Sequence, residues 1–113
     1  MKTLHVESGR HLYGGGLQVV FLLQGLKARG EPGVLVCPEG SAIATAARPH
    51  ALAVHEIPMK GDLDWGMTGR LRALIRAERP ALVQLHSRRG SDLWGALAAR
   101  REGVPVLLSR RVD

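Results

Sequence analysis

Short apolar runs and helix-spaced apolar stripes alternate along the whole 113-residue chain, and this alternation constrains the fold more than any other feature. Apolar runs bounded by turn residues are typical of strands covered on both faces, and apolar residues every three or four positions are typical of helices. The pattern predicts five strands with four helices between them, at residues 3–7, 17–29, 34–37, 42–47, 52–57, 67–78, 81–85, 92–101 and 105–109.

The predicted fold class is α/β, a Rossmann-like, doubly wound parallel sheet with helices on both faces. Right-handed crossovers and the usual reversal of direction predict the strand order 3-2-1-4-5. No internal repeat or low-complexity linker divides the sequence, so residues 1–113 are expected to form one domain. The last strand runs directly into Arg110-Arg111-Val112-Asp113, and we expect the chain to be a truncated part of a longer polypeptide.

The composition is that of an ordinary globular domain. With 45% hydrophobic and 23% charged residues, the sequence does not fit a disordered chain. The net charge of +6 suits nucleic acid, lipid headgroups or a phosphorylated substrate and does not choose among them. The single cysteine, Cys37, lies in an apolar run and is expected to be a small core residue. No apolar run reaches the roughly 20 residues of a membrane span, and no signal peptide follows Lys2, so a cytoplasmic location is expected.

Two polar loops are expected to meet at the carboxyl edge of the sheet, between the first and fourth strands. Ligands of open parallel sheets bind at this edge, where the strand order reverses. The fifth strand ends at the same edge and adds a further arginine. The candidate site residues are Arg10, Gly14, Gly15, Gly16, His86, Arg88, Arg89 and Arg110.

The three glycines allow two interpretations. Without side chains they let the backbone approach a ligand, and the helix N-terminus that follows offers free N–H groups to an anion. The alternative is a mobile turn. A P-loop is excluded because Gly-Lys-Ser/Thr does not occur. NAD binding is not expected, because the third glycine of G-x-G-x-x-G is missing and Cys37-Pro38 precedes the first acid after the second strand.

His86, at the end of the fourth strand, can donate a hydrogen bond to a sugar hydroxyl or to developing charge. Such a histidine is more often structural, and its place opposite the glycine loop favours a functional role. Arg88 and Arg89 can pair with phosphate or form ordinary solvated surface. The histidines at positions 5, 50 and 55 show no metal-ligand spacing, so no metal site is expected.

Three stretches carry a resemblance to a known family. GGGLQVVFLLQGLKARG, PEGSAIATAA and RPALVQLHSRRGSDLWGALAARREGVPVLLSRRVD, in this order, resemble the N-terminal domain of family-four glycosyltransferases. The resemblance covers essentially the whole chain and is to bacterial members that act in lipopolysaccharide and cell-envelope biosynthesis. It implies the GT-B architecture, in which two Rossmann-like domains face each other across a cleft.

In that architecture the N-terminal domain mainly binds the acceptor, and the C-terminal domain binds the nucleotide-sugar through a Glu-x7-Glu element. We expect the C-terminal domain to be missing from these 113 residues, and the chain by itself to be inactive. The resemblance implies retaining transfer to a glycan or glycolipid, without a metal or other cofactor and without nucleic acid. It also implies that Gly14, Gly15 and Gly16 approach the donor diphosphate and that His86 lies near the transferred sugar. Arg88 and Arg89 would lie beside the acceptor entrance.

The chain departs from the family where many members have an earlier histidine, since Gln84 stands two residues before His86. Its basic surface is expected to lie near the anionic inner membrane, as a peripheral contact. Two other interpretations remain open at this stage. One is a stand-alone Rossmann-like binding module that pairs with a separate donor-binding subunit. The other is a receiver-type signalling domain, which Glu7 and Glu56 fit poorly.

Overall fold

The computed structural model describes residues 1–9, 12, 15–59, 66–86 and 91–108. Each expected element is present, with boundaries within two residues of the prediction. The elements are, in chain order, β1 (Thr3–Val6), α1 (Gly15–Ala28), β2 (Gly33–Pro38), α2 (Ala42–Ala47), β3 (Ala53–Ile57), α3 (Met67–Glu78), β4 (Leu82–Leu85), α4 (Ser91–Arg101) and β5 (Val106–Leu108).

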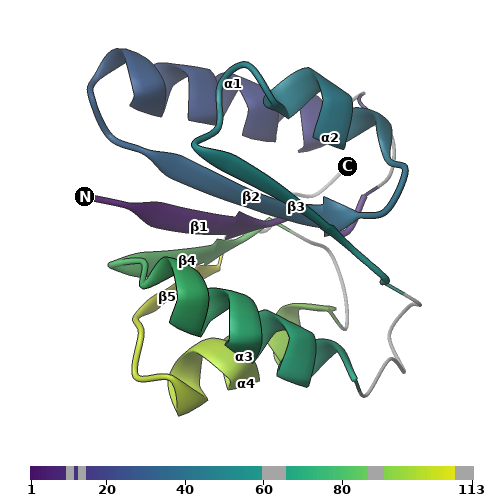
Figure 1. Cartoon of the computed structure of the whole chain (residues 1–113), viewed down its shortest axis with the longest axis vertical. Coiled ribbons are helices and arrows are strands. Elements are labelled where there is room, and N and C mark those ends of the chain that lie inside the picture. Colours follow the sequence, from purple (N-terminus) through teal and green to yellow (C-terminus); the bar gives the residue numbers. More distant parts are fainter. Residues whose placement is uncertain (10–11, 13–14, 60–65, 87–90, 109–113) are drawn as a thin grey trace.

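The five strands form one parallel sheet in the order β3-β2-β1-β4-β5, which confirms the predicted fold class and strand order. Helices α1 and α2 cover one face of the sheet, and α3 and α4 cover the other (Figure 1). Strand β1 is therefore central, since it pairs with β2 on one side and with β4 on the other.

Alternation along the strands divides the core into two layers, one under each pair of helices. In the layer under α3 and α4, alternate residues of β1, β2 and β4 pack together, and the buried side chains there are Leu4, Val6, Val34, Val36, Met67, Leu71, Ile75, Val83, Leu85, Ala98 and Ala99. The buried side chains of the layer under α1 and α2 are Val19, Val20, Leu23, Leu35, Cys37, Ile43, Ala44 and Ala47. Cys37 is a fully buried free thiol, as its apolar run predicts.

Three helix termini show how the helices begin and end. Ser41 occupies the N-cap position of α2 with an extended backbone, yet its side chain makes no capping hydrogen bond. Its backbone carbonyl instead accepts a hydrogen bond from the N–H of Ala44, at 3.2 Å. Arg79 ends α3 in the left-handed conformation, with φ of 48°, a position that glycine occupies more readily. Gly30 follows α1 with a φ of 75°, which agrees with its predicted role of ending the helix.

The buried face of α4 differs from the expectation. The spacing of Leu93, Trp94 and Leu97 predicts that these large side chains point inward, whereas the structure buries Gly95, Ala98 and Ala99. Trp94 is half-buried against the core, Leu97 is half-buried, and the side chain of residue 93 lies outside the described part of the chain. Small residues face inward because the helix packs closely on the sheet.

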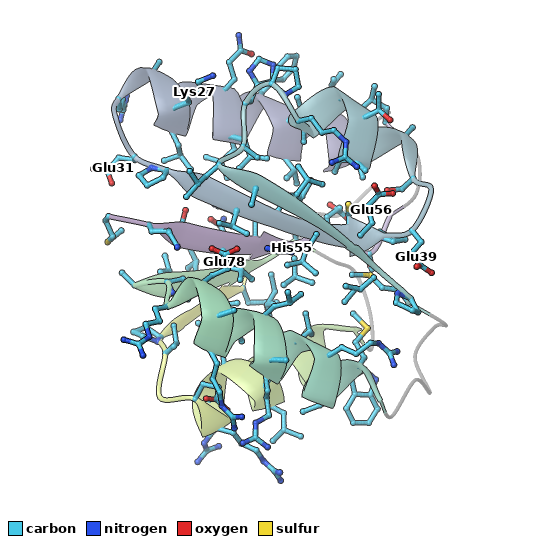
Figure 2. The ribbon with its side chains drawn as sticks, viewed as in Figure 1. Lys27, Glu31, Glu39, His55, Glu56 and Glu78 are labelled. Carbon is cyan, nitrogen blue, oxygen red and sulfur yellow. The ribbon has the colours of Figure 1, made fainter. Side chains whose placement is uncertain are left out.

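An ion-pair cluster ties β1, β3 and α3 together. His55 of β3 and Glu78 at the end of α3 point toward one another (Figure 2), with Nε2 and Oε2 2.6 Å apart. The ammonium of Lys2 lies 3.0 Å from the other oxygen of Glu78. The hydrogen bond from His55 and the nearby Lys2 lower the pKa of Glu78 despite its partial burial. The cluster joins three elements and leaves its acid already paired.

Close packing of α4 generates the first testable prediction. A Cβ on Gly95 would lie 2.6 Å from Cδ2 of Leu85 and 3.4 Å from its Cδ1, in the buried core. Overpacking of this kind costs ~1–3 kcal/mol, which exceeds the ~1 kcal/mol that alanine gains over glycine in a helix. We expect Gly95→Ala to lower the free energy of unfolding by about 1 kcal/mol, measured by urea denaturation.

Gly69 of α3 provides the matched control, because nothing lies within 4 Å of the Cβ that alanine would add there. Gly69→Ala is expected to raise the free energy of unfolding by ~0.5–1 kcal/mol. Equal stabilisation by both substitutions would contradict the close approach of α4 to Leu85.

Candidate functional site

The candidate site lies at the carboxyl edge of the sheet, at the boundary between β1 and β4. Here the strand order reverses, so the connections from the two strands lead to opposite faces of the sheet. The sheet hydrogen bonds continue one residue past each strand. The N–H of His86 donates to the carbonyl of Val6 at 2.8 Å, and the N–H of Glu7 donates to the carbonyl of Val36 at 3.0 Å. These bonds fix the backbone of His86 and of Glu7 on the rigid sheet.

His86 is buried, with 4% of its surface exposed, and its ring is held by a second histidine. Nε2 of His86 lies 2.9 Å from Nδ1 of His5, and the two rings stack with centroids 5.2 Å apart. Nε2 of His5 lies in turn 2.8 Å from Oγ1 of Thr3. The three side chains form a continuous hydrogen-bonded chain that starts at the beginning of β1 and ends at the candidate site.

His5 is neutral near pH 7 in this setting. The residue is 1% exposed, and burial lowers the pKa of its imidazole from 6.5 to about 4. Glu7, two residues further along the same strand, is also buried, and its Oε2 accepts a hydrogen bond from the N–H of Gly9 at 2.9 Å. The carboxyl end of β1 thus leads to the buried side chain of Glu7 and to a histidine pair in which His5 is neutral.

The glycine loop leads directly into α1. Gly15 and Gly16 form the first turn of this helix, which carries no acidic residue, and the positive end of a helix dipole favours an anion. The other predicted site residues, Arg10, Gly14, Arg88, Arg89 and Arg110, lie outside the described residues. The structure therefore brings His86 to the predicted edge and begins α1 within the predicted glycine motif.

Sequence reasoning missed His5 and Thr3 as partners of His86. The available signal was a polar alternation, Thr3, His5 and Glu7, in a strand whose other residues are Leu4 and Val6. A central strand covered on both faces normally has apolar residues at such positions. The alternation therefore marked one face of β1 as polar, although it could not identify the partner on β4.

Other chemical groups do not form a competing centre. Burial raises the pKa of the Cys37 thiol, which makes it a poor nucleophile. Within the described residues, no three His, Cys, Asp or Glu side chains gather in an arrangement that could hold a metal ion.

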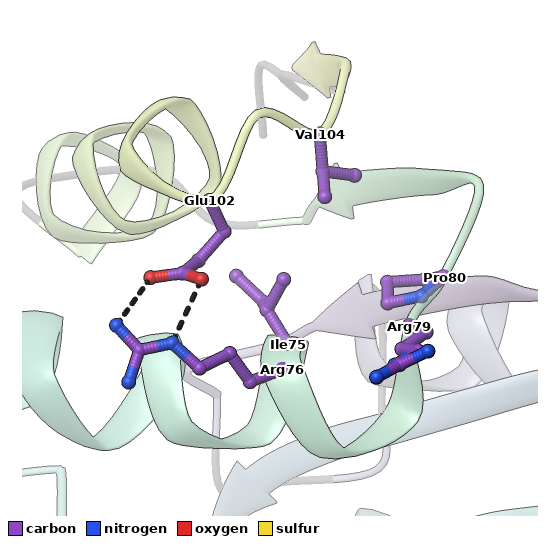
Figure 3. A pocket seen from close by; sticks show the side chains of 6 residues that line it. All are labelled: Ile75, Arg76, Arg79, Pro80, Glu102 and Val104. Atoms are coloured by element: carbon purple, nitrogen blue, oxygen red, sulfur yellow. Dashed lines mark hydrogen bonds and ion pairs between the residues drawn. The ribbon is translucent and has the colours of Figure 1, made fainter.

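A pocket of about 380 Å³ lies at the opposite, amino edge of the sheet (Figure 3). Its lining includes Pro80 and Val104, which precede β4 and β5, together with Arg76 and Glu102. The Glu102 carboxylate is paired with Arg72 at 2.8 Å and with Arg76 at 2.9 Å. The pocket is thus remote from His86, and its acid serves to join α3 to the end of α4.

Solved structures with this fold include several enzymes of sugar metabolism. A glycosyltransferase from Rickettsia africae matches with a TM-score of 0.74 and 13% identity, over 99% of this chain and 31% of its own. MurG from Acinetobacter baumannii matches with a TM-score of 0.73 and 15% identity, over 95% of this chain and 34% of its own. Alr3699/HepE from Anabaena, solved in complex with UDP and glucose, matches with a TM-score of 0.70 and 17% identity, over 96% of this chain and 29% of its own.

These likenesses define the class of the fold, a Rossmann-like α/β domain. The sequence adds the family. The model of the glycosyl transferase 4-like domain matches residues 14–111, and the chain belongs to this family. This confirms the resemblance read from the sequence.

The chain spans about a third of the length of these three solved structures. No curated protein matches the sequence. Among the helices of the described residues, none is both long and apolar enough to cross a membrane.

The buried His5 predicts a characteristic pH dependence of stability. The unfolded chain takes up a proton on His5 near pH 6.5, whereas the folded chain resists it down to about pH 4. The contribution of His5 is therefore fully present above pH 6.5 and is lost as the pH falls toward 4, with a slope of up to ~1.4 kcal/mol per pH unit. We expect urea denaturation of the wild type to show this loss between pH 6.5 and 4.5.

Two non-titrating replacements, His5→Asn and His5→Phe, should both flatten this slope, whatever their stability at neutral pH. The measurement stops at pH 4.5 because the pKa of Glu78 is lowered in the folded chain, so the stability that Glu78 contributes is lost only at lower pH. An identical slope in the wild type and both variants would show that His5 is not held neutral.

Proposed function

We propose that this domain is the acceptor-side part of a retaining, metal-independent glycosyltransferase. The enzyme would transfer a sugar from a nucleotide-sugar to a glycan or glycolipid, such as a lipopolysaccharide precursor of the bacterial cell envelope. The observation that carries the proposal is the family match over residues 14–111, which includes the start of α1 and His86. The hydrogen-bonded position of His86 at the carboxyl edge supports it.

The chemistry available at the carboxyl edge suits a sugar diphosphate. The N-terminus of α1 would direct backbone N–H groups and a positive dipole at phosphate oxygens, and Gly14, Gly15 and Gly16 would let the backbone come close. Arg10, Arg88, Arg89 and Arg110 would add positive charge from the neighbouring loops. Alr3699/HepE, which shares the fold, was solved with UDP and glucose, and this supports a nucleotide-sugar donor.

Most of the donor site would lie on a second Rossmann-like domain. The 113 residues correspond to about a third of MurG and of the Rickettsia glycosyltransferase, and we propose that the donor is bound mainly by a Glu-x7-Glu element outside this sequence. The chain alone would then be inactive. The proposed chemistry uses no metal, although Asp62-Leu63-Asp64 has the Asp-x-Asp spacing and lies outside the described residues.

His86 is the proposed catalytic residue. In the enzyme that joins this domain to its donor-binding half, His86→Ala is expected to lower kcat by ~10²–10³-fold, the usual effect of removing one hydrogen-bond donor from developing charge. Transfer is measured with a radiolabelled nucleotide-sugar in the presence of EDTA, which tests metal independence in the same assay.

His50→Ala serves as the matched control, because His50 lies after α2 and away from the carboxyl ends of β1 and β4. An unchanged kcat for His86→Ala would exclude His86 as a catalytic residue. Loss of wild-type activity in EDTA would exclude the metal-independent mechanism.

We also propose a peripheral contact with the anionic inner face of the cytoplasmic membrane. Its support is the arginines of α3, α4 and the residue after α3, namely Arg70, Arg79, Arg100 and Arg101, with Arg72 and Arg76, which share the charge of Glu102. Such a surface attracts anionic headgroups, each cation contributing about 1 kcal/mol near the bilayer.

Arg101→Glu tests this contact, because Arg101 is exposed in the last turn of α4. We expect binding to phosphatidylglycerol-containing vesicles to weaken about tenfold in low salt and to disappear for all variants in high salt. Arg29→Glu, with the same charge change at an exposed position after α1, should bind like the wild type. Absence of wild-type binding to anionic vesicles in low salt would remove the membrane proposal.

A further inference from the structure

The hydrogen bonds that link Thr3, His5 and His86 determine where the protons of these side chains lie. Both ring nitrogens of His5 are engaged, Nε2 with Thr3 at 2.8 Å and Nδ1 with His86 at 2.9 Å. Two neutral arrangements are possible. In one, every proton points toward His86, and in the other, every proton points toward Thr3.

The hydroxyl of Thr3 distinguishes the two arrangements. It is 6% exposed, and among the described residues its contact with His5 is the only hydrogen bond that its side chain makes. If His5 donated to this oxygen, the hydroxyl proton would be buried without an acceptor. If Thr3 donates to Nε2 of His5, the hydroxyl proton is satisfied and the proton of His5 must lie on Nδ1.

The position of the His5 proton determines the tautomer of His86. Because Nδ1 of His5 donates, Nε2 of His86 must accept, and the proton of a neutral His86 lies on its own Nδ1. We infer that Thr3 and His5 are positioning residues that hold His86 in the Nδ1–H tautomer, as a neutral hydrogen-bond donor. The catalytic consequence rests on the proposed function, whereas the tautomer itself does not.

Packing keeps this arrangement in place. His5 lies beside Gly33 of β2, where an added Cβ would come within 3.7 Å of both Cδ2 and Nε2 of the imidazole. The same Cβ would lie 2.6 Å from Cδ2 of Leu23, so α1 closes over the strand at this point. The ring of His5 is thus confined between neighbouring elements, and the stacked ring of His86 is confined with it.

A proton arriving at Nε2 of His86 would meet the donating N–H of His5. Protonation of His86 would therefore require two changes. The proton of His5 would have to move from its Nδ1 to its own Nε2, and the hydroxyl proton of Thr3 would have to turn away from His5.

Among the described residues, the titratable groups on this side of the sheet include Glu7, which directly follows β1, and the Cys37 thiol of β2. Glu56 of β3 and its ion-pair partner Arg48 also act on Cys37 from this side. The Glu7 carboxylate accepts a hydrogen bond from Gly9 and lies one residue past the end of β1.

Nuclear magnetic resonance of the 113-residue chain tests the inference directly. Long-range ¹H–¹⁵N correlation spectra of ¹⁵N-histidine-labelled protein distinguish the two neutral tautomers, because an unprotonated ring nitrogen resonates far downfield of a protonated one. His86→Gln assigns the signals. We expect the downfield signal of wild-type His86 to belong to Nε2 at pH 7.5.

Thr3→Val and Thr3→Ser form the matched pair. Valine removes the donor with little change in shape and should shift His86 toward a mixture of tautomers, with loss of the pure Nδ1–H pattern. Serine keeps the hydroxyl and should preserve the wild-type pattern. His5→Asn retains an N–H close to the position of Nδ1 and should also preserve it, whereas His5→Phe should not.

The inference is overturned if wild-type His86 carries its proton on Nε2, or if Thr3→Val leaves the pattern unchanged. The spectra are recorded without a nucleotide-sugar and without a sugar acceptor. If His86→Ala does not affect sugar transfer, the catalytic role of His86 is refuted, but the inferred tautomer is not. If wild-type His86 is the Nε2–H tautomer, the inference is refuted, but the proposed function is not.

Discussion

The central position of β1 is the constraint on which the site depends. Its backbone is hydrogen-bonded to β2 and β4, and all four of its residues are buried. A polar side chain in such a strand has no access to water and must be satisfied by a neighbour. Thr3 and His5 satisfy each other, and the remaining nitrogen of His5 reaches His86. The need to satisfy buried polar groups thus holds a side chain in place at the edge of the sheet.

The strand order and the element positions could be predicted because they depend on local patterns. A period of two or 3.6 residues can be recognised within a single segment, and right-handed crossovers leave few topologies for a β-α chain. The polar positions of β1 were visible in the same way. What could not be predicted is the register of β1 against β4. It places His5 opposite Gln84 and brings His86 one step beyond Leu85, and it arises from interactions between distant segments.

The same limit explains why the sequence pattern of α4 missed the buried residues Gly95, Ala98 and Ala99. Leu93, Trp94 and Leu97 are the larger apolar residues of that helix, so a hydrophobic pattern favours them as the buried face. The structure packs the helix so close to Leu85 that only Gly95 and the alanines fit between. Which side chains are buried depends on both the helix and the sheet surface it packs against, and the sequence of the helix describes only the helix. Glycines and alanines at helical spacing can therefore mark the closest contact in a domain.

The charged groups at the two edges of the sheet differ, and this difference limits which groups could stabilise charge in the proposed reaction. At the amino edge, Glu102 is already neutralised by Arg72 and Arg76. At the carboxyl edge, the described groups include a helix N-terminus, a histidine pair in which His5 is neutral, and the buried Glu7, which accepts a hydrogen bond from Gly9. Fixed dipoles of this kind stabilise developing charge without reorganising during the reaction. A donor held neutral by His5 would strengthen its hydrogen bond as charge grows on a sugar oxygen, with no proton transfer. In the proposed enzyme, the full charges that balance a diphosphate would then have to come from the arginine-bearing loops and from the donor-binding domain.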